Sequence, residues 1–322
     1  IYLGHPGNVV LPEIPENLIA KPTLVWLIDN NATDQKIEAT YLTRGIGWRA
    51  DYVVTMDKAE KEAAIEAWVT LNNQSGTAYE NAKLKLVAGD VNQVTPAAPA
   101  QAMLEMRARA AAPMMQQESF AEYHLYTLPR RTTIKENQSK QVSLFTAEGV
   151  EVSKRYEYRG NTNFYSQRMT RFDPQHVEVF VQFENEEDNG LGVPLPGGIM
   201  RIYQEDSESM LQFAGEDRIQ HTPKAETVTL RMGTAFDVVA ERVQTDFSRI
   251  SDRVFEAEFE ISVRNHKEDN VVVHVVEPMP ADWEVLSASH GHDKKDAFTA
   301  VFPLEVVSDG ETVLKYRVRV RY

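Results

Sequence analysis

The stretch FEAEFEISVR at residues 255–264 decides the fold class, because its apolar and polar side chains alternate without a break. A period of two is the pattern of a β-strand with one buried face and one solvated face. The last segment, LKYRVRVRY at residues 314–322, repeats this period with Lys and Arg in the polar positions, where the first stretch has Glu. If the two strands pair, each Glu opposite an Arg adds about 0.2–1 kcal/mol and helps to fix the register.

Further strand signals surround these two segments. Apolar runs at residues 271–276, 283–286 and 297–306 are separated by turn-forming stretches such as Lys267–Asn270 and Ser308–Gly310. Short strands between turns at this spacing are typical of a β-sandwich. We therefore predict an immunoglobulin-like or fibronectin-like sandwich over residues 233–322.

The rest of the chain carries the same kind of pattern in two more segments. Residues 1–94 are predicted to form an N-terminal β module, and residues 123–232 a middle β module. Their expected strands lie at residues 23–28, 37–42, 50–56, 64–71, 82–87, 141–145, 150–158, 176–183, 198–204 and 227–231. The predicted fold class is therefore all-β, with tandem antiparallel β-sandwich modules.

One segment interrupts the strand pattern. Residues 95–122 are rich in Ala, Met and Pro, which predicts an insertion or linker between two β modules. Residues Ala100–Ala112 could form a short helix bounded by Pro99 and Pro113. Such a helix could dock a partner, but a mobile linker is the favoured interpretation.

The composition limits the classes of function. A formal net charge of −14 disfavours binding to a nucleic-acid backbone, so no nucleic-acid partner is expected. No run approaches the roughly 18 apolar residues that a membrane helix needs. The absence of cysteine excludes disulfides, thiolate nucleophiles and thiolate metal sites.

Catalytic and metal-binding motifs were sought without success. The chain has no GxSxG, HExxH or SxxK arrangement and no phosphate-binding glycine loop, so no catalytic residue and no cofactor is predicted. The candidate metal ligands are His290 and His292, but they lack an obvious third partner, and an exposed turn is the favoured interpretation. His274 is expected to be a satisfied strand histidine. The acidic stretch Glu184–Gly190 is expected to be a solvated hairpin tip, because its spacing does not fit a calcium loop.

Several segments resemble a bacterial family of unknown function, the domain-of-unknown-function 4139 family, found at the C-terminal end of mucoidy inhibitor A-like proteins. They are KPTLVWLI (21–28), YLTRGIGWRADY (41–52), LNNQSGTAYENAKLKLVAGDVN (71–92), LGVPLPGGIMRIYQED (191–206), FAGEDRIQHTP (213–223), MGTAFDVVAER (232–242) and ISVRNHKEDNVVVHVVE (261–277). The resemblance implies a β-rich protein of the periplasm or cell envelope without an established reaction. It also implies an upstream region, so Ile1 is expected to follow a removed or missing segment.

Two functions are consistent with this pattern. The favoured one is a non-enzymatic, extracytoplasmic scaffold or protein-interaction module, with a protein partner that the sequence does not identify. The alternative is a hydrolase or carbohydrate-active protein whose site lies in a groove between modules. Convergent histidine and carboxylate side chains in a deep pocket would favour the alternative.

Overall fold

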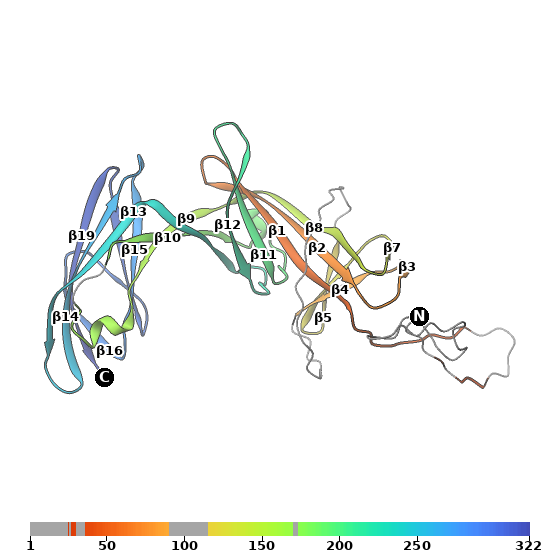
Figure 1. Cartoon of the computed structure of the whole chain (residues 1–322), viewed down its shortest axis with the longest axis horizontal. Coiled ribbons are helices and arrows are strands. Elements are labelled where there is room, and N and C mark those ends of the chain that lie inside the picture. Colours follow the sequence, from red (N-terminus) through yellow and green to blue (C-terminus); the bar gives the residue numbers. More distant parts are fainter. Residues whose placement is uncertain (1–24, 26, 30–35, 90–114, 170–172) are drawn as a thin grey trace, which may run out of the picture. The chain divides into compact units, whose positions relative to one another are not determined.

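The computed structural model of the chain describes residues 25, 27–29, 36–89, 115–169 and 173–322 (Figure 1). Within this part of the chain strands predominate, and the helical elements are two short 3-10 helices, η1 (Thr162–Tyr165) and η2 (Glu187–Asn189). The strands form several sheets in which antiparallel pairing prevails. The predicted all-β class is therefore confirmed.

The first of the two large sheets has five strands in the order β12-β11-β1-β2-β8. Its strands are β1 (Ile46–Met56), β2 (Glu62–Asn73), β8 (Gln138–Glu151), β11 (Gly198–Glu205) and β12 (Leu211–Ile219). Every second residue of β2 from Ala63 to Leu71 is buried, as the period-two rule requires. Two small sheets follow, β4-β6-β5 and β3-β7, built from β3 (Tyr79–Ala82), β4 (Lys85–Ala88), β5 (Gln116–Phe120), β6 (Tyr123–Thr127) and β7 (Thr132–Ile134).

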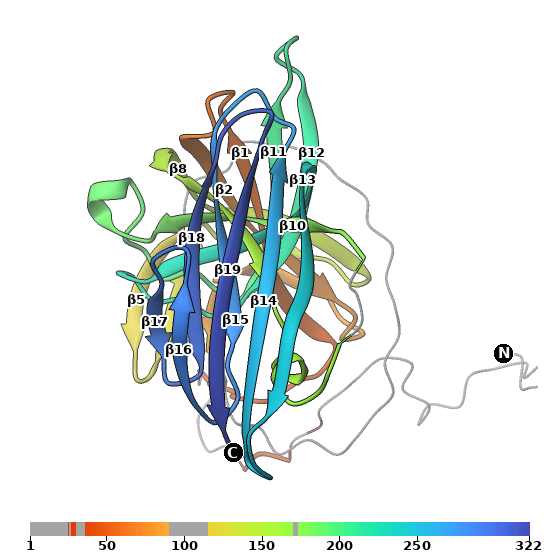
Figure 2. The same ribbon diagram turned by 90° about the vertical axis from the view of Figure 1, so that its left-hand side faces the viewer.

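The second large sheet has nine strands in the order β16-β19-β14-β13-β10-β9-β15-β18-β17. It folds back on itself, so that apolar residues from both of its halves enclose one core in which Phe302 stacks on Tyr316. Figure 2 shows its longest strands side by side. The nine strands are β9 (Ser153–Arg159), β10 (Gln175–Glu184), β13 (Thr227–Arg249), β14 (Val254–Asn265), β15 (Val271–Pro278), β16 (Asp282–Ala288), β17 (Asp293–Asp296), β18 (Thr299–Val306) and β19 (Gly310–Arg321).

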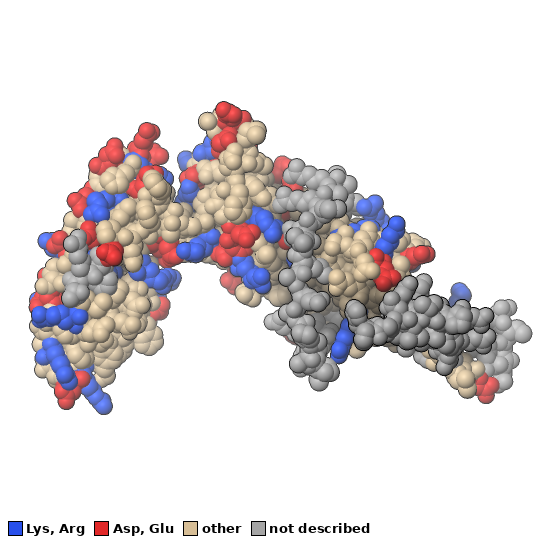
Figure 3. Space-filling model, in the orientation of Figure 1, with Lys and Arg blue, Asp and Glu red and all other residues tan. Residues whose placement is uncertain are grey.

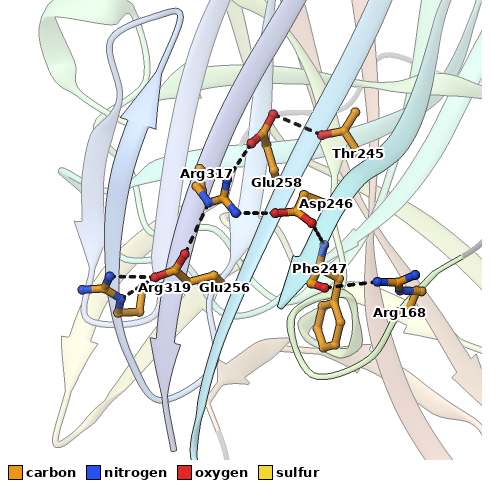
Figure 4. A network of polar contacts seen from close by, with 8 residues as sticks. All are labelled: Arg168, Thr245, Asp246, Phe247, Glu256, Glu258, Arg317 and Arg319. Carbon is orange, nitrogen blue, oxygen red and sulfur yellow. Dashed lines mark hydrogen bonds and ion pairs between the residues drawn. The ribbon is translucent and has the colours of Figure 1, made fainter. Parts of the chain in front are cut away.

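The two segments that decided the fold class pair as expected. Strands β14 and β19 are antiparallel neighbours without a register shift, and Glu256 lies opposite Arg319 and Glu258 opposite Arg317. Both pairs are ion pairs, with a nitrogen–oxygen distance of 2.7 Å for Arg319 and Glu256 and 3.1 Å for Arg317 and Glu258 (Figure 4). Asp246 of β13 joins Arg317 and extends this ladder across three strands. The conditional prediction of Glu–Arg pairing is therefore confirmed.

A buried asparagine fixes the end of one long strand in each large sheet. Asn265, the last residue of β14, accepts a hydrogen bond from the main-chain N–H two residues on and donates to the carbonyl oxygen four residues on. Its amide also reaches the carbonyl oxygens of Val306 and Val307, where β18 ends. Asn73, the last residue of β2, makes the same set of bonds, and its distant partners are Ile134 and Lys135 at the end of β7.

The surroundings of these two asparagines match as well. The residue after each donates its N–H to a main-chain carbonyl. Gln74 donates to Gly45, directly before β1, and His266 donates to Asp237, directly before the part of β13 that pairs with β14. The turn that follows β7 and the turn that follows β18 each place one residue in the left-handed region, Asn137 and Asp309. We call these two arrangements the Asn73 unit and the Asn265 unit. Both use one strand order and one set of turn bonds.

Strand pairing crosses the domain boundaries that were predicted from the sequence. Strands β1 and β2 share a sheet with β11 and β12, and β9 and β10 share a sheet with β14 and β19. Two compact units divide the chain, Ile1–Ala50 with Trp68–Leu144 and Asp51–Ala67 with Phe145–Tyr322. Both the four-segment division and the immunoglobulin-like character of the last segment stay predictions.

Other sequence expectations have mixed outcomes. The strand predicted at residues 37–42 is wrong, because these residues are exposed and form no ladder. Of residues 95–122, Gln116–Phe120 forms strand β5, whereas the expected helix at residues 100–112 lies outside the described part of the chain. No helix within the described ranges has the length and apolar character that crossing a membrane requires.

Candidate functional site: a groove beside a strand bulge

Strand β13 is interrupted by a bulge where it passes β10. Val239 lies opposite His176, and the next pair is Thr234 with Glu178, so Val177 alone faces the stretch 235–238 of β13. Bulges of this kind redirect side chains and are over-represented beside functional sites. Here the bulge turns Phe236 outward, where its side chain is 85% exposed, while Val238, two residues on, is buried in the core.

A groove of about 220 Å³ lies beside this bulge. Its lining includes the apolar side chains of Val179, Ala214 and Met232, and the ring of Phe236 is stacked on His176, the two ring centroids being 6.1 Å apart. The groove is lined by Lys154, Tyr156, Val179, Ala214, Met232, Gly233, Thr234, Ala235, Phe236, Asp237 and Lys267. We call this feature the bulge groove.

Two ammonium groups, those of Lys154 and Lys267, line the bulge groove together with Asp237. Lys267 donates to the hydroxyl of Tyr156 at 3.0 Å, and Lys154 forms an ion pair with Glu60, which also accepts from Gln204 at 2.8 Å. Partial burial by itself would lower the pKa of Lys267, but its bond to Tyr156 and the neighbouring carboxylates outweigh burial and raise it. Burial would likewise raise the pKa of Glu60, but Lys154 outweighs it and lowers that pKa. Lys267 is therefore charged at neutral pH.

The groove combines features of a binding surface. Apolar lining residues, an exposed aromatic ring and a few fixed charges are what a peptide side chain and its neighbours need for recognition. The lining residues include no His, Ser or Cys. Across the described part of the chain, no group of three or more His, Cys, Asp or Glu side chains is placed to hold a metal ion.

A second polar cluster lies inside the nine-stranded sheet. Arg242 of β13 and Glu277 of β15 form an ion pair in which both side chains are 0% exposed. Glu277 also accepts from the hydroxyl of Tyr165 at 2.6 Å, and Arg242 donates to Tyr316 at 3.3 Å. Burial raises the pKa of both tyrosines, so their hydroxyls stay protonated and can donate. We call these four residues the buried cluster.

The buried cluster is closed to ligands. A Cβ atom added at Gly160 would lie 2.2 Å from a carboxylate oxygen of Glu277 and 3.1 Å from a guanidinium nitrogen of Arg242, so the chain passes directly over the pair. The ring of Phe164 in η1 packs on the guanidinium, with its centroid 4.9 Å away. Burial would lower the pKa of Arg242, but the Glu277 carboxylate outweighs burial and raises it. The cluster therefore holds the 160–165 segment to the core.

Among the residues that the structure describes, the histidines singled out in the sequence belong to no group of three or more His, Cys, Asp or Glu side chains that could hold a metal ion. His290 and His292 lie in the connection between β16 and β17, where His290 bonds to Ser289 at 2.8 Å and the His292 ring contacts Phe302. The expectation of a turn between two strands is confirmed for this loop. His274 lies in strand β15 as predicted and has a backbone hydrogen bond with Tyr156, whereas its buried Nδ1 has no hydrogen-bond partner in the described part of the chain. Burial and the guanidinium of Arg155 lower the pKa of His274.

The acidic stretch Glu184–Gly190 is not a hairpin tip. Strand β10 ends at Glu184, and the next strand, β11, belongs to the other large sheet, so the stretch connects two sheets. The prediction failed because Asn185 is buried there and donates to the carbonyl oxygens of Val193 and Pro223, both at 2.8 Å. The many acidic residues of the stretch predicted a solvated loop and gave no sign that Asn185 would be buried and hydrogen-bonded.

Sequence reasoning missed the residues of the bulge groove. Alternation places Phe236 on the same side of its strand as Val238 and Ala240, which are buried, so the pattern predicts a core residue where the structure has an exposed one. The available signal was Gly233, since an isolated glycine within a strand pattern often marks a bulge. Phe236 lies in the MGTAFDVVAER segment and Lys267 in the ISVRNHKEDNVVVHVVE segment, both quoted above for the resemblance.

Comparison with known proteins gives a family but no activity. No curated protein matches the chain. The family described as Domain of unknown function (DUF4139) matches residues 37–322, which include the bulge groove and the buried cluster. Because this match covers most of the chain, the protein belongs to the DUF4139 family.

Proposed function

We propose that the chain is a non-enzymatic protein-interaction module and that the bulge groove is its binding surface. The observation that carries the proposal is Phe236, an aromatic side chain that is 85% exposed on a bulge and lines a groove together with Val179, Ala214 and Met232. Large aromatic residues next to pockets are the residue type that most often dominates binding energy at protein interfaces. Lys154, Lys267 and Asp237 add fixed charges that can orient a partner.

The proposal includes a location and a subgroup. We place the chain among the mucoidy inhibitor A-like proteins and outside the cytoplasm, in the periplasm or cell envelope. Support for both comes from the segments that resemble that group, in particular YLTRGIGWRADY and LGVPLPGGIMRIYQED. Fractionation of cells that express the protein from its own gene tests the location.

Affinity capture from the native envelope tests the binding function. A tagged chain should retain its partner, and Phe236→Ser should reduce the recovered partner at least about tenfold, the effect of losing one interface anchor. Phe298→Ser is the matched control, because Phe298 is also exposed, at 60%, but lies in the turn between β17 and β18. Equal recovery with all three proteins would refute the groove as the binding surface.

A hydrolase or carbohydrate-active protein stays the alternative prediction. Its site was expected in a deep pocket with convergent histidine and carboxylate side chains. The bulge groove contributes Asp237, two lysines and a tyrosine to such a site. Turnover of a polysaccharide or ester substrate that is abolished by Asp237→Asn would establish this alternative and overturn the proposal.

A further inference from the structure

The hairpin formed by β11 and β12 carries exposed apolar side chains at and beside its turn. Met210, Leu211 and Phe213 are 60%, 48% and 58% exposed. Strand β12 is the outermost strand of the five-stranded sheet that the described residues form, and the turn projects past the neighbouring strands (Figure 1). Covering apolar side chains of this kind stabilises an association. We call residues 205–213 the hairpin tip.

Hydrogen bonds hold the hairpin tip in one arrangement. The Asp206 carboxylate accepts from the main-chain N–H groups of Glu208 and Met210, both at 2.9 Å. It also accepts from the side-chain amide of Gln212 at 2.8 Å. The bonds from Met210 and Gln212 lower the pKa of Asp206, so the carboxylate that organises the turn is ionised at neutral pH. A turn that is already ordered loses little conformational entropy when it binds.

The hairpin tip is acidic. It contains Glu205, Asp206 and Glu208 and no Lys or Arg, and acidic side chains gather at the turn in Figure 3. Lys58 donates to the turn, to the carbonyl oxygen of Ser207 at 3.4 Å, which leaves a surplus of two negative charges. Because Asp206 is used within the turn, the exposed Glu208 is the acidic group that can meet a cation of a partner.

The lining of the bulge groove has the opposite sign. It contains two lysines and one aspartate, a surplus of one positive charge in a chain whose net charge is −14. Lys154 already forms an ion pair with Glu60, whereas Lys267 donates to the uncharged hydroxyl of Tyr156. An ammonium group bonded to a hydroxyl has further donors for a carboxylate. Lys267 is therefore the cation of the groove that an acidic segment would pair with.

The apolar part of the groove suits a side chain of the hairpin tip. A volume of about 220 Å³ is several times the roughly 30 Å³ of one water, so the groove can admit a large side chain. Met210 is the most exposed of the three apolar side chains of the hairpin tip. Methionine is flexible and adapts to irregular pockets. Its natural place is beside Phe236, the most exposed apolar residue of the lining.

The hairpin tip and the bulge groove are neighbours on one copy of the chain. Ala214, which lines the groove, directly follows Phe213 in β12. At the base of the hairpin, Gln204 donates to Glu60 at 2.8 Å, and the same carboxylate pairs with Lys154 of the groove. A two-fold axis near this junction can bring both surfaces onto their counterparts at once, which is the arrangement of an isologous interface.

We propose that the hairpin tip of one copy of the chain docks in the bulge groove of a second copy. Met210 enters the groove beside Phe236, and Glu208 pairs with Lys267. Reciprocal exchange gives two identical contacts and a closed two-fold dimer. The inference rests on the proposed function, which it deepens by making a second copy the protein that the groove binds.

Charge exchange tests the contact in solution by light scattering. The native chain should dimerise, and Glu208→Lys and Lys267→Glu should each raise the dimer dissociation constant about tenfold or more, because each contact then joins like charges. An equimolar mixture of the two variants should dimerise about as tightly as the native chain, since both contacts of the mixed dimer join opposite charges. A misfolded variant could not restore association in this way.

The matched control replaces Glu208→Lys by Glu136→Lys, an exposed acidic residue in the turn between β7 and β8. Mixed with Lys267→Glu, it should not restore tight association. A native chain that stays monomeric overturns the inference, as does a mixture of Glu208→Lys and Lys267→Glu that associates no more tightly than either variant alone.

Engineered disulfides test which residues meet, because the native chain contains no cysteine. A mixture of Met210→Cys with a tagged Phe236→Cys chain should give a mixed dimer band on a non-reducing gel under mild oxidation. The control mixture of Met210→Cys with tagged Phe298→Cys, an exposed thiol elsewhere, should give little. Mixed bands of equal intensity overturn the inference.

Affinity capture separates this inference from the proposed function. If the native chain is monomeric but Phe236→Ser still loses its captured partner, the groove binds a different protein, so the inference falls and the proposed function stands. If the chain is monomeric and recovery with Phe236→Ser is unchanged, both fall.

Discussion

Removing the charge of Glu277 tests whether the buried cluster is an essential ion pair. In Glu277→Gln the side chain keeps its size, but Arg242 stays fully buried without a counter-charge. Breaking a buried pair by removing one partner costs about 3–5 kcal/mol, because the remaining charge is uncompensated. The Tyr165 hydroxyl can still donate to the remaining amide oxygen, so the loss in the free energy of unfolding should lie near 3 kcal/mol rather than 5.

Urea unfolding monitored by circular dichroism measures this loss. Glu284→Gln is the matched control, because Glu284 also pairs with an arginine, Arg321, but its side chain is 55% exposed, and such pairs contribute about 0–1 kcal/mol. The double variant Arg242→Met/Glu277→Leu removes both charges and should be more stable than Glu277→Gln. A loss below about 1 kcal/mol for Glu277→Gln, or a double variant less stable than the single one, would refute the reasoning.

Three further changes have expected outcomes. Gly160→Ala should lower the free energy of unfolding by about 1–3 kcal/mol in urea melts, because its Cβ would lie 2.2 Å from a carboxylate oxygen, whereas Gly291→Ala, with no atom within 4 Å, should change it by less than about 0.5 kcal/mol. Asn73→Ala and Asn265→Ala should each cost about 2–4 kcal/mol, because each removes the amide that donates to one buried and two partly buried carbonyls; a neutral result for either would contradict the shared role. Lys267 has a raised pKa, so its contribution to stability is complete below 10.5 and is lost as pH rises through the higher folded-state pKa; Lys267→Met should remove this part of the alkaline pH dependence of the unfolding midpoint.

The strands were predictable wherever one face is buried and the other is solvated. In β14 and β19 alternation fixed both the strands and the face that carries charge, because a shift by one residue would bury every Glu and Arg. The same rule failed for residues 37–42, where a strand pattern exists but no neighbour pairs with it in the structure. Sequence periodicity indicates which side chains of a segment could be buried. Whether the segment pairs in a sheet depends on whether another strand lies next to it.

The candidate site was hidden from the sequence for two physical reasons. A bulge shifts the register, so Phe236 has the parity of a core residue but an exposed side chain. In the buried cluster the sequence shows the reverse case, a charged residue at a position where alternation predicts a core residue. Arg242 continues the inward positions of Val238 and Ala240, and Glu277 continues those of Val273 and Val275. Two opposite charges at inward positions of different strands could have been matched only with knowledge that β13 and β15 face one core.

The outer face of β13, β14 and β19 explains why binding should concentrate at the bulge groove. On that face Arg317 contacts Asp246, Glu256 and Glu258, and acidic and basic side chains lie interspersed over the surface drawn in Figure 3. A partner docking there would have to remove water from charges that are already paired, which costs more than new contacts return. At Phe236 the exposed group is apolar, so covering it releases water at no such cost. The proposed binding function therefore predicts contact at the bulge rather than on the face that carries the charge ladder.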